Sequence, residues 1–138
     1  MTEIIFAAHG LSATGMRDSV EMVIGPQDNF HTVMLSQEVG IESFKAELGE
    51  LVRRFRIEGK TDILILTDIP AGTPYNVGVE LSLEYDGVAV LSGTNFSMVL
   101  AALEISDIPL DEMVLEIITT GREAVGTFKE IISTEEDF

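Results

Sequence analysis

The chain of 138 residues contains no cysteine and no tryptophan, and it has only four prolines. The absence of cysteine excludes disulfide bonds, thiolate metal sites and cysteine nucleophiles, and it is compatible with a reducing cytoplasm. Only two histidines, His9 and His31, are available as transition-metal ligands. We therefore expect no bound metal and no other cofactor.

Basic side chains are scarce, because 8 Lys and Arg residues stand against 24 Asp and Glu, for a formal net charge of -16. Such a surface repels nucleic-acid phosphates and anionic lipid, so nucleic acid is not an expected partner. It favours a protein partner with a basic docking face. Acidity also keeps a protein soluble without any partner, so the charge alone leaves both interpretations open.

Long apolar runs are missing as well. Runs such as residues 63–66 are far shorter than a membrane span, and the N-terminus carries Glu3 instead of the basic residues of a signal peptide. The sequence contains no internal repeat and no Pro-rich linker. We therefore expect a cytoplasmic protein in which residues 1–138 form a single free-standing domain.

Short apolar runs alternate with segments of helical periodicity. We expect strands at residues 3–8, 30–35, 62–67 and 88–91, and helices at 16–24, 41–58, 74–84, 96–105 and 110–119. The first helix is expected to bury Val20, Val23 and Ile24, and the second an apolar face that begins at Ile41. This alternation predicts an α/β fold with a parallel sheet between two layers of helices, and such sheets bind ligands beyond the carboxyl ends of their strands.

His9 directly follows the first predicted strand, and Asp68 directly follows the third. If those strands are neighbours, the carboxylate can accept a hydrogen bond from one imidazole nitrogen and leave the other with a free lone pair. An imidazole held in this way can act as a base, an acid, a metal ligand or a nucleophile. Each residue also has an ordinary interpretation, His9 as a hydrogen-bonded strand end and Asp68 as a helix cap or turn residue.

The loop after Asp68 contains Gly72, Thr73 and Pro74 immediately before a predicted helix. Glycine lets the backbone approach a ligand closely, and helix N-termini bind anions. A phosphoryl group on His9 would therefore meet hydrogen-bond donors in this loop. An ordinary strand-to-helix turn can have the same composition, so the loop taken alone does not decide between the two.

Four short motifs follow the predicted strands and the last helix. They are His9-Gly10, Asp68 followed by Gly72-Thr73-Pro74-Tyr75-Asn76, Ser92-Gly93-Thr94-Asn95, and Thr120-Gly121-Arg122-Glu123-Ala124. In order and spacing they resemble the IIA component of the mannose-family sugar phosphotransferase system (PTS), over nearly the whole chain. The resemblance implies a sheet in the order 2-1-3-4 and a role as a phosphocarrier.

The same resemblance implies that His9 is phosphorylated on Nε2, that Asp68 holds Nδ1–H, and that Gly10, Gly72 and Thr73 surround the phosphoryl group. The phosphocarrier protein HPr would be the donor and a IIB component the acceptor, with the membrane IIC and IID subunits reached indirectly. The family also implies a homodimer in which residues 127–132 add an antiparallel fifth strand to the sheet of the second copy.

Three other functions stay open at this stage. The phosphotransferase subunit of a dihydroxyacetone kinase shares the implied fold and a histidine at a strand end, although the run at residues 72–76 favours the sugar family. A regulatory domain could sense relay phosphate without feeding transport. A flavodoxin-like module could bind a ligand without any phosphate chemistry.

Overall fold

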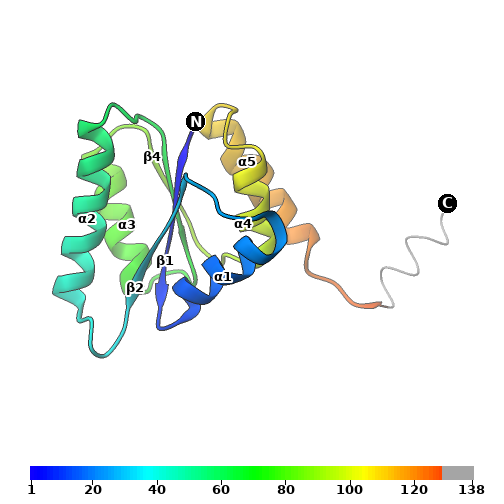
Figure 1. Ribbon diagram of the computed structural model, residues 1–138, viewed down its shortest axis with the longest axis horizontal. Coiled ribbons are helices and arrows are strands. Elements are labelled where there is room, and N and C mark those ends of the chain that lie inside the picture. Colours follow the sequence, from blue (N-terminus) through cyan, green and yellow to red (C-terminus); the bar gives the residue numbers. More distant parts are fainter. Residues whose placement is uncertain (129–138) are drawn as a thin grey trace.

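A computed structural model describes residues 1–128 and shows a four-stranded parallel sheet between two layers of helices (Figure 1). The strands are β1 (Glu3–His9), β2 (Phe30–Leu35), β3 (Ile63–Thr67) and β4 (Val88–Leu91). The helices are α1 (Ser12–Ile24), α2 (Ile41–Ile57), α3 (Thr73–Glu84), α4 (Phe96–Glu104) and α5 (Leu110–Glu123). The order in the sheet is β2-β1-β3-β4, which confirms the expected fold class and strand order.

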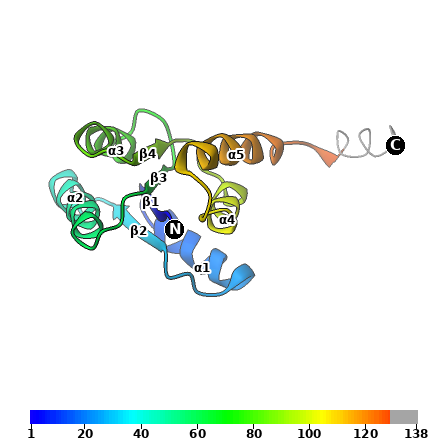
Figure 2. The same cartoon turned by 90° about the horizontal axis from the view of Figure 1, so that it is seen from above.

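Helices α2 and α3 cover one face of the sheet, and α1, α4 and α5 cover the other (Figure 2). The two central strands, β1 and β3, are buried on both faces, which explains their uninterrupted apolar sequences. Because successive side chains point to opposite faces, Ile4 and Leu64 pack under α1, α4 and α5, while Ile5 and Ile65 pack under α2 and α3.

Helix α2 is amphipathic as predicted. Its fully or almost fully buried side chains are Phe44, Leu48, Val52 and Phe55, at spacings of three and four residues. Ile41 was expected on the same face, but it is 56% exposed. The reason is its position in the first turn, where it borders a surface hollow next to Leu35 instead of the sheet.

Helix α1 ends at Ile24 as predicted, but it differs from the prediction in its start and in the burial of its last turn. It begins at Ser12 instead of residue 16, because Ala13 is fully buried against the core and offsets the low helix propensity of Gly15. Burial of Val20 is confirmed. The prediction that Val23 and Ile24 are buried was wrong. Their side chains are 58% and 43% exposed, on a last turn that projects away from the sheet (Figure 1).

Two of the sequence motifs meet where α4 packs against α5. The Asn95 side chain accepts a hydrogen bond from the Met98 N–H and donates one to the Gly121 carbonyl, both at 3.0 Å. A methyl group at Gly121 would lie 2.6 Å from Cγ of Met98, so only glycine allows this contact. Gly121 lies within α5, which continues to Glu123, past its expected end at residue 119.

In the described part of the chain, residues 1–128, no helix is both long and apolar enough to cross a bilayer. The strand expected at residues 127–132 lies largely outside the described residues. Its first two residues, Thr127 and Phe128, are exposed and follow the end of α5.

Candidate functional site

His9 is the last residue of β1, and Asp68 immediately follows β3. Because β1 and β3 are hydrogen-bonded neighbours, the two residues emerge side by side at the carboxyl edge of the sheet. Nδ1 of His9 lies 2.8 Å from Oδ2 of Asp68, and the backbone N–H of His9 donates to the same oxygen at 2.9 Å. The structure thus brings together the imidazole and the carboxylate that the sequence singled out.

Opposing effects act on the pKa of Asp68. Partial burial raises the pKa, but hydrogen bonds from the His9 backbone N–H, the His9 ring and the Ile69 N–H stabilise the charged form and outweigh it. The Ile69 N–H reaches the second oxygen, Oδ1, at 3.0 Å. The pKa of Asp68 is therefore lower than its usual value, and the group is a carboxylate at neutral pH.

The charge of Asp68 determines which nitrogen of His9 carries the proton. A carboxylate has only acceptors, so the short contact with Asp68 requires a proton on Nδ1. In the neutral ring Nε2 then keeps its lone pair. No group within residues 1–128 hydrogen-bonds to Nε2, and the His9 side chain is 46% exposed. The ring therefore presents an unoccupied lone pair at the surface.

The backbone of His9 is fixed by its neighbours. The Ser12 hydroxyl donates to the His9 carbonyl at 2.6 Å, and the Gly10 N–H donates to the Leu35 carbonyl at 2.6 Å. Gly10 has a φ of 59°, which turns the chain sharply from β1 into α1. Because the Gly10 N–H is already hydrogen-bonded to the Leu35 carbonyl, the contribution of Gly10 to the site is this turn. Sequence reasoning missed Ser12, although a serine three residues after a strand end and at the start of a helix is a signal for such a bond.

The loop between β3 and α3 curls back against the imidazole. Ala71 has a φ of 61°, a left-handed conformation that is strained for a residue with a side chain. Left-handed turns of this kind point successive N–H groups in one direction. The amides of Gly72, Thr73 and Tyr75 have no acceptor within the described residues, so the start of α3 offers three donors near the ring.

Gly72 makes the closest approach to His9. A methyl group added at Gly72 would lie 3.2 Å from Cε1 of His9 and 3.4 Å from Cγ1 of Ile69. The φ of Gly72 is -86°, which any residue can adopt. Glycine is therefore favoured here by its nearness to the ring and not by the backbone conformation, because any side chain would push the imidazole aside.

We expect Gly72→Ala to slow a reaction at Nε2 roughly tenfold, because the ring must shift by a fraction of an ångström from its productive position. The matched control is Gly49→Ala, since Gly49 lies within α2 outside the hollow beside His9 and has no atom within 4 Å of the added methyl. Comparing both rates, together with melting temperatures, isolates the contact with the ring. Equal rates in the two variants would contradict it.

The lowered pKa of Asp68 makes part of the stability depend on pH. A carboxyl whose native pKa is below its unfolded value, near 3.8, stabilises the fold above that pH, and this contribution disappears as the pH falls through the native pKa. We expect wild type to be more stable than Asp68→Asn above about pH 5, and the difference to shrink below about pH 3. Urea unfolding across this range measures it, and a difference independent of pH would refute the linkage.

His31 does not belong to this site. Its Nε2 lies 2.8 Å from Oε1 of Glu3, near the start of β1, and its ring packs against Phe55 with centroids 4.7 Å apart. Within residues 1–128 no three His, Asp or Glu side chains converge as metal ligands. The chemistry available at the strand ends is therefore that of His9 and its neighbours.

The surroundings of His9 are largely apolar and open. A hollow of about 470 Å³ beside the ring is lined in part by Leu35 and Ile41. Leu11 and Ile69, which lie next to the site in the sequence, are 77% and 53% exposed. An exposed imidazole bordered by apolar side chains, on a chain of net charge -16, suits contact with another protein surface.

Known proteins similar to this chain are consistent with one another. The family EIIA-man, described as the PTS system fructose IIA component, matches residues 3–119. The sorbose-specific EIIA component of the PTS from Lacticaseibacillus casei is 29% identical over 141 residues, which cover 99% of each chain. The mannose-specific EIIAB component of Escherichia coli K12 is 27% identical over 132 residues, which cover 91% of this chain and 39% of that protein.

Solved structures resemble the fold closely. The PTS component EIIA from Streptococcus agalactiae has a TM-score of 0.86 and 31% identity, covering 94% of this chain and 99% of that one. The mannose/sorbose-specific IIA subunit from Enterococcus faecalis has a TM-score of 0.82 and 26% identity, covering 92% and 94%. These matches span the sheet and both strand ends that carry His9 and Asp68.

Proposed function

Since this chain belongs to the EIIA-man family of IIA components, and so is a phosphocarrier in sugar uptake, we propose that His9 is the residue that carries the phosphoryl group. One observation supports this most strongly. The carboxylate of Asp68 binds the Nδ1 side of the ring at 2.8 Å, and Nε2 is left accessible on a side chain that is 46% exposed. A nucleophilic histidine needs both conditions.

In the proposed step, Nε2 of His9 attacks the phosphorus of a phosphohistidine on HPr. The new N–P bond forms as the N–P bond in the donor breaks, and the donor nitrogen regains its lone pair. His9 keeps its Nδ1 proton, so its ring becomes cationic, and the Asp68 carboxylate stabilises that charge. Little covalent work is left to the protein, whose contribution is alignment and electrostatics.

The phosphoryl oxygens on His9 would be received by the start of α3. The amides of Gly72, Thr73 and Tyr75 are free of acceptors in the described part of the chain, and so is the Thr73 hydroxyl. A helix N-terminus also has a partial positive charge that favours an anion. These groups can hold the charge of the phosphoryl group without a metal ion.

The IIA family works with HPr and IIB components, and we propose HPr as the donor to His9 and IIB as the acceptor, both in the cytoplasm. The apolar hollow beside His9 and the exposed side chains of Leu11 and Ile69 offer each protein a small contact. Small contacts exchange quickly, as a relay requires. The membrane IIC and IID subunits would be reached only through IIB.

The test is incubation of the purified chain with phosphoenolpyruvate, the general relay enzyme and HPr, followed by addition of IIB. We expect one acid-labile phosphate on His9 and its discharge to IIB. No phosphate would indicate a binding module without this chemistry. Discharge only in the presence of dihydroxyacetone kinase subunits would favour that family, and a phosphate that IIB cannot remove would favour a regulatory domain.

We also propose a homodimer. Within residues 1–128, β4 has no strand on its outer side, and a groove of about 420 Å³ beside it is lined in part by Ser92 and Arg122. Val125, in the same groove, leads from α5 toward the strand expected at residues 127–132. Sedimentation should give twice the chain mass of 15.0 kDa, whereas a monomer at all concentrations would refute the dimer.

A further inference from the structure

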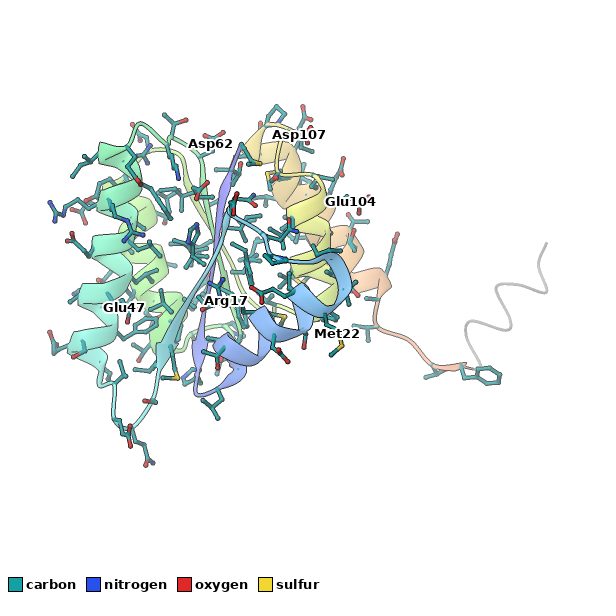
Figure 3. The ribbon with its side chains drawn as sticks, viewed as in Figure 1. Arg17, Met22, Glu47, Asp62, Glu104 and Asp107 are labelled. Atoms are coloured by element: carbon teal, nitrogen blue, oxygen red, sulfur yellow. The ribbon has the colours of Figure 1, made fainter. Side chains whose placement is uncertain are left out.

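Strand β2 forms the second edge of the sheet, opposite to β4, with α1 over one face and α2 over the other (Figure 2). A groove of about 330 Å³ follows this edge and is lined by side chains from all three elements, among them Arg17 of α1, Thr32 of β2 and Glu47 and Arg54 of α2. Figure 3 shows Arg17 and Glu47 on the two helices that flank the strand. A strand edge can accept a further strand when its backbone groups are free.

The hydrogen bonds to β1 reveal which backbone groups of β2 point outward. The N–H of Ile4 donates to the Asn29 carbonyl, and the N–H of Gly10 donates to the Leu35 carbonyl. In a parallel pair, backbone groups of alternate residues face the same side. Residues 29, 31, 33 and 35 therefore face β1. The N–H and C=O groups of residues 30, 32 and 34 face away from the sheet.

One of these three outward residues is already occupied. The Phe30 N–H donates to the Gln27 carbonyl, and the Phe30 carbonyl accepts a hydrogen bond from Arg17, both at 3.3 Å. The outward groups of Thr32 and Met34 have no partner within the described residues. Each of these two residues therefore has an unpaired N–H and an unpaired C=O. The two residues lie about 6.6 Å apart along the strand, which is the repeat that a neighbouring strand matches.

The charge of this groove differs from that of the chain as a whole. The sequence has three acidic residues for each basic one, yet neither Arg17 nor Arg54 forms an ion pair within residues 1–128. Of the two carboxylates in the groove, Glu50 is held by Arg53 at 2.6 Å, which leaves only Glu47 without a basic partner. Distant charges are screened beyond about 8 Å at physiological salt, so two arginines against one unpaired carboxylate leave the groove with a net positive charge.

We propose that the free edge of β2 binds an extended, acidic segment of another protein by strand addition. The segment pairs its backbone with Thr32 and Met34, and its carboxylates lie against Arg17 and Arg54. The same arginines disfavour a second copy of β2 at this edge, because that copy brings identical positive charges. The interaction does not depend on a phosphoryl group at His9.

The probe is a capped peptide of alternating valine and glutamate, and its control has lysine in place of glutamate. Binding to the full chain is followed by NMR, with amide hydrogen exchange measured along β2. We expect the glutamate peptide alone to slow exchange of the Thr32 and Met34 amides. Equal effects of both peptides, or binding that leaves these two amides unprotected, would overturn the proposal, as would no binding of the glutamate peptide.

Two pairs of variants separate backbone pairing from charge. Thr32→Pro removes an outward N–H without touching the ladder to β1, while Thr32→Val keeps that N–H and the branched shape. Arg54→Gln removes charge from the groove, while Lys45→Gln removes it elsewhere on α2, where Lys45 pairs with Glu80.

We expect about tenfold weaker peptide binding for Thr32→Pro and for Arg54→Gln, and wild-type binding for their controls. Circular dichroism verifies that each variant is folded. If Thr32→Pro does not fold, the comparison of Arg54→Gln with Lys45→Gln is decisive. Unchanged binding by Arg54→Gln would then refute the proposal.

Discussion

Phosphorylation by phospho-HPr should be abolished when His9 is replaced by alanine. The chain has no cysteine, and its only other histidine, His31, is paired with Glu3 near the opposite end of β1. No second nucleophile of comparable strength lies at the carboxyl edge of the sheet in the described part of the chain. Acid-labile phosphate retained after incubation with phosphoenolpyruvate, the general relay enzyme and HPr measures the effect.

His31→Gln is the matched control, because it removes the only other imidazole. We expect that variant to accept one phosphate as wild type does. The His9 side chain is 46% exposed, so His9→Ala should change the melting temperature by only a few degrees. Normal phosphorylation of His9→Ala, or its loss in a folded His31→Gln, would refute the assignment of His9.

Asp68→Asn should slow phosphoryl transfer to His9 by about 10²–10⁴-fold, the range seen when the group that orients a catalytic histidine is changed. The amide NH₂ of asparagine can donate to Nδ1, which moves the ring proton to Nε2 and removes the attacking lone pair. The variant also lacks the negative charge that stabilises the cationic phosphorylated ring. Rapid-quench measurement of a single turnover from phospho-HPr gives the rate.

Asp107→Asn controls for the loss of one negative charge. Asp107 is exposed and lies at the opposite end of the molecule, near the start of β1 (Figure 3). It should leave the transfer rate within about twofold of wild type, since exposed charges that far away are screened. If both variants slow transfer equally, overall charge and not the orientation of the ring would explain the effect of Asp68.

The central part of the fold was predictable because local and tertiary preferences agree there. The sequence of β3 is apolar at every position, and the strand is buried at every position, as a central parallel strand must be. The start of α1 was not predictable in the same way. Gly15 disfavours a helix, and only the burial of Ala13 in the folded protein outweighs that preference.

The candidate site, too, has features that the sequence predicts and features that only the folded structure determines. His9 and Asp68 could be found because the ends of neighbouring parallel strands meet at one edge of a sheet. The left-handed Ala71 could not, because it depends on the path of a loop that no sequence period describes. The bond from the Ser12 hydroxyl to the His9 carbonyl was missed, although the position of Ser12 at a helix start gave a signal for it. The unpaired amides of β2 likewise follow from the register with β1, which only the structure supplies.

The nitrogen that bonds to phosphorus is the most direct measure of whether Asp68 sets the chemistry of His9. In chain with isotope-labelled histidine, phosphorylated by HPr, the nitrogen–phosphorus coupling in the NMR spectrum identifies that atom. We expect the coupling at Nε2, with Nδ1 still protonated and hydrogen-bonded to the carboxylate. A coupling at Nδ1 would mean that Asp68 does not hold that nitrogen, and it would contradict the account.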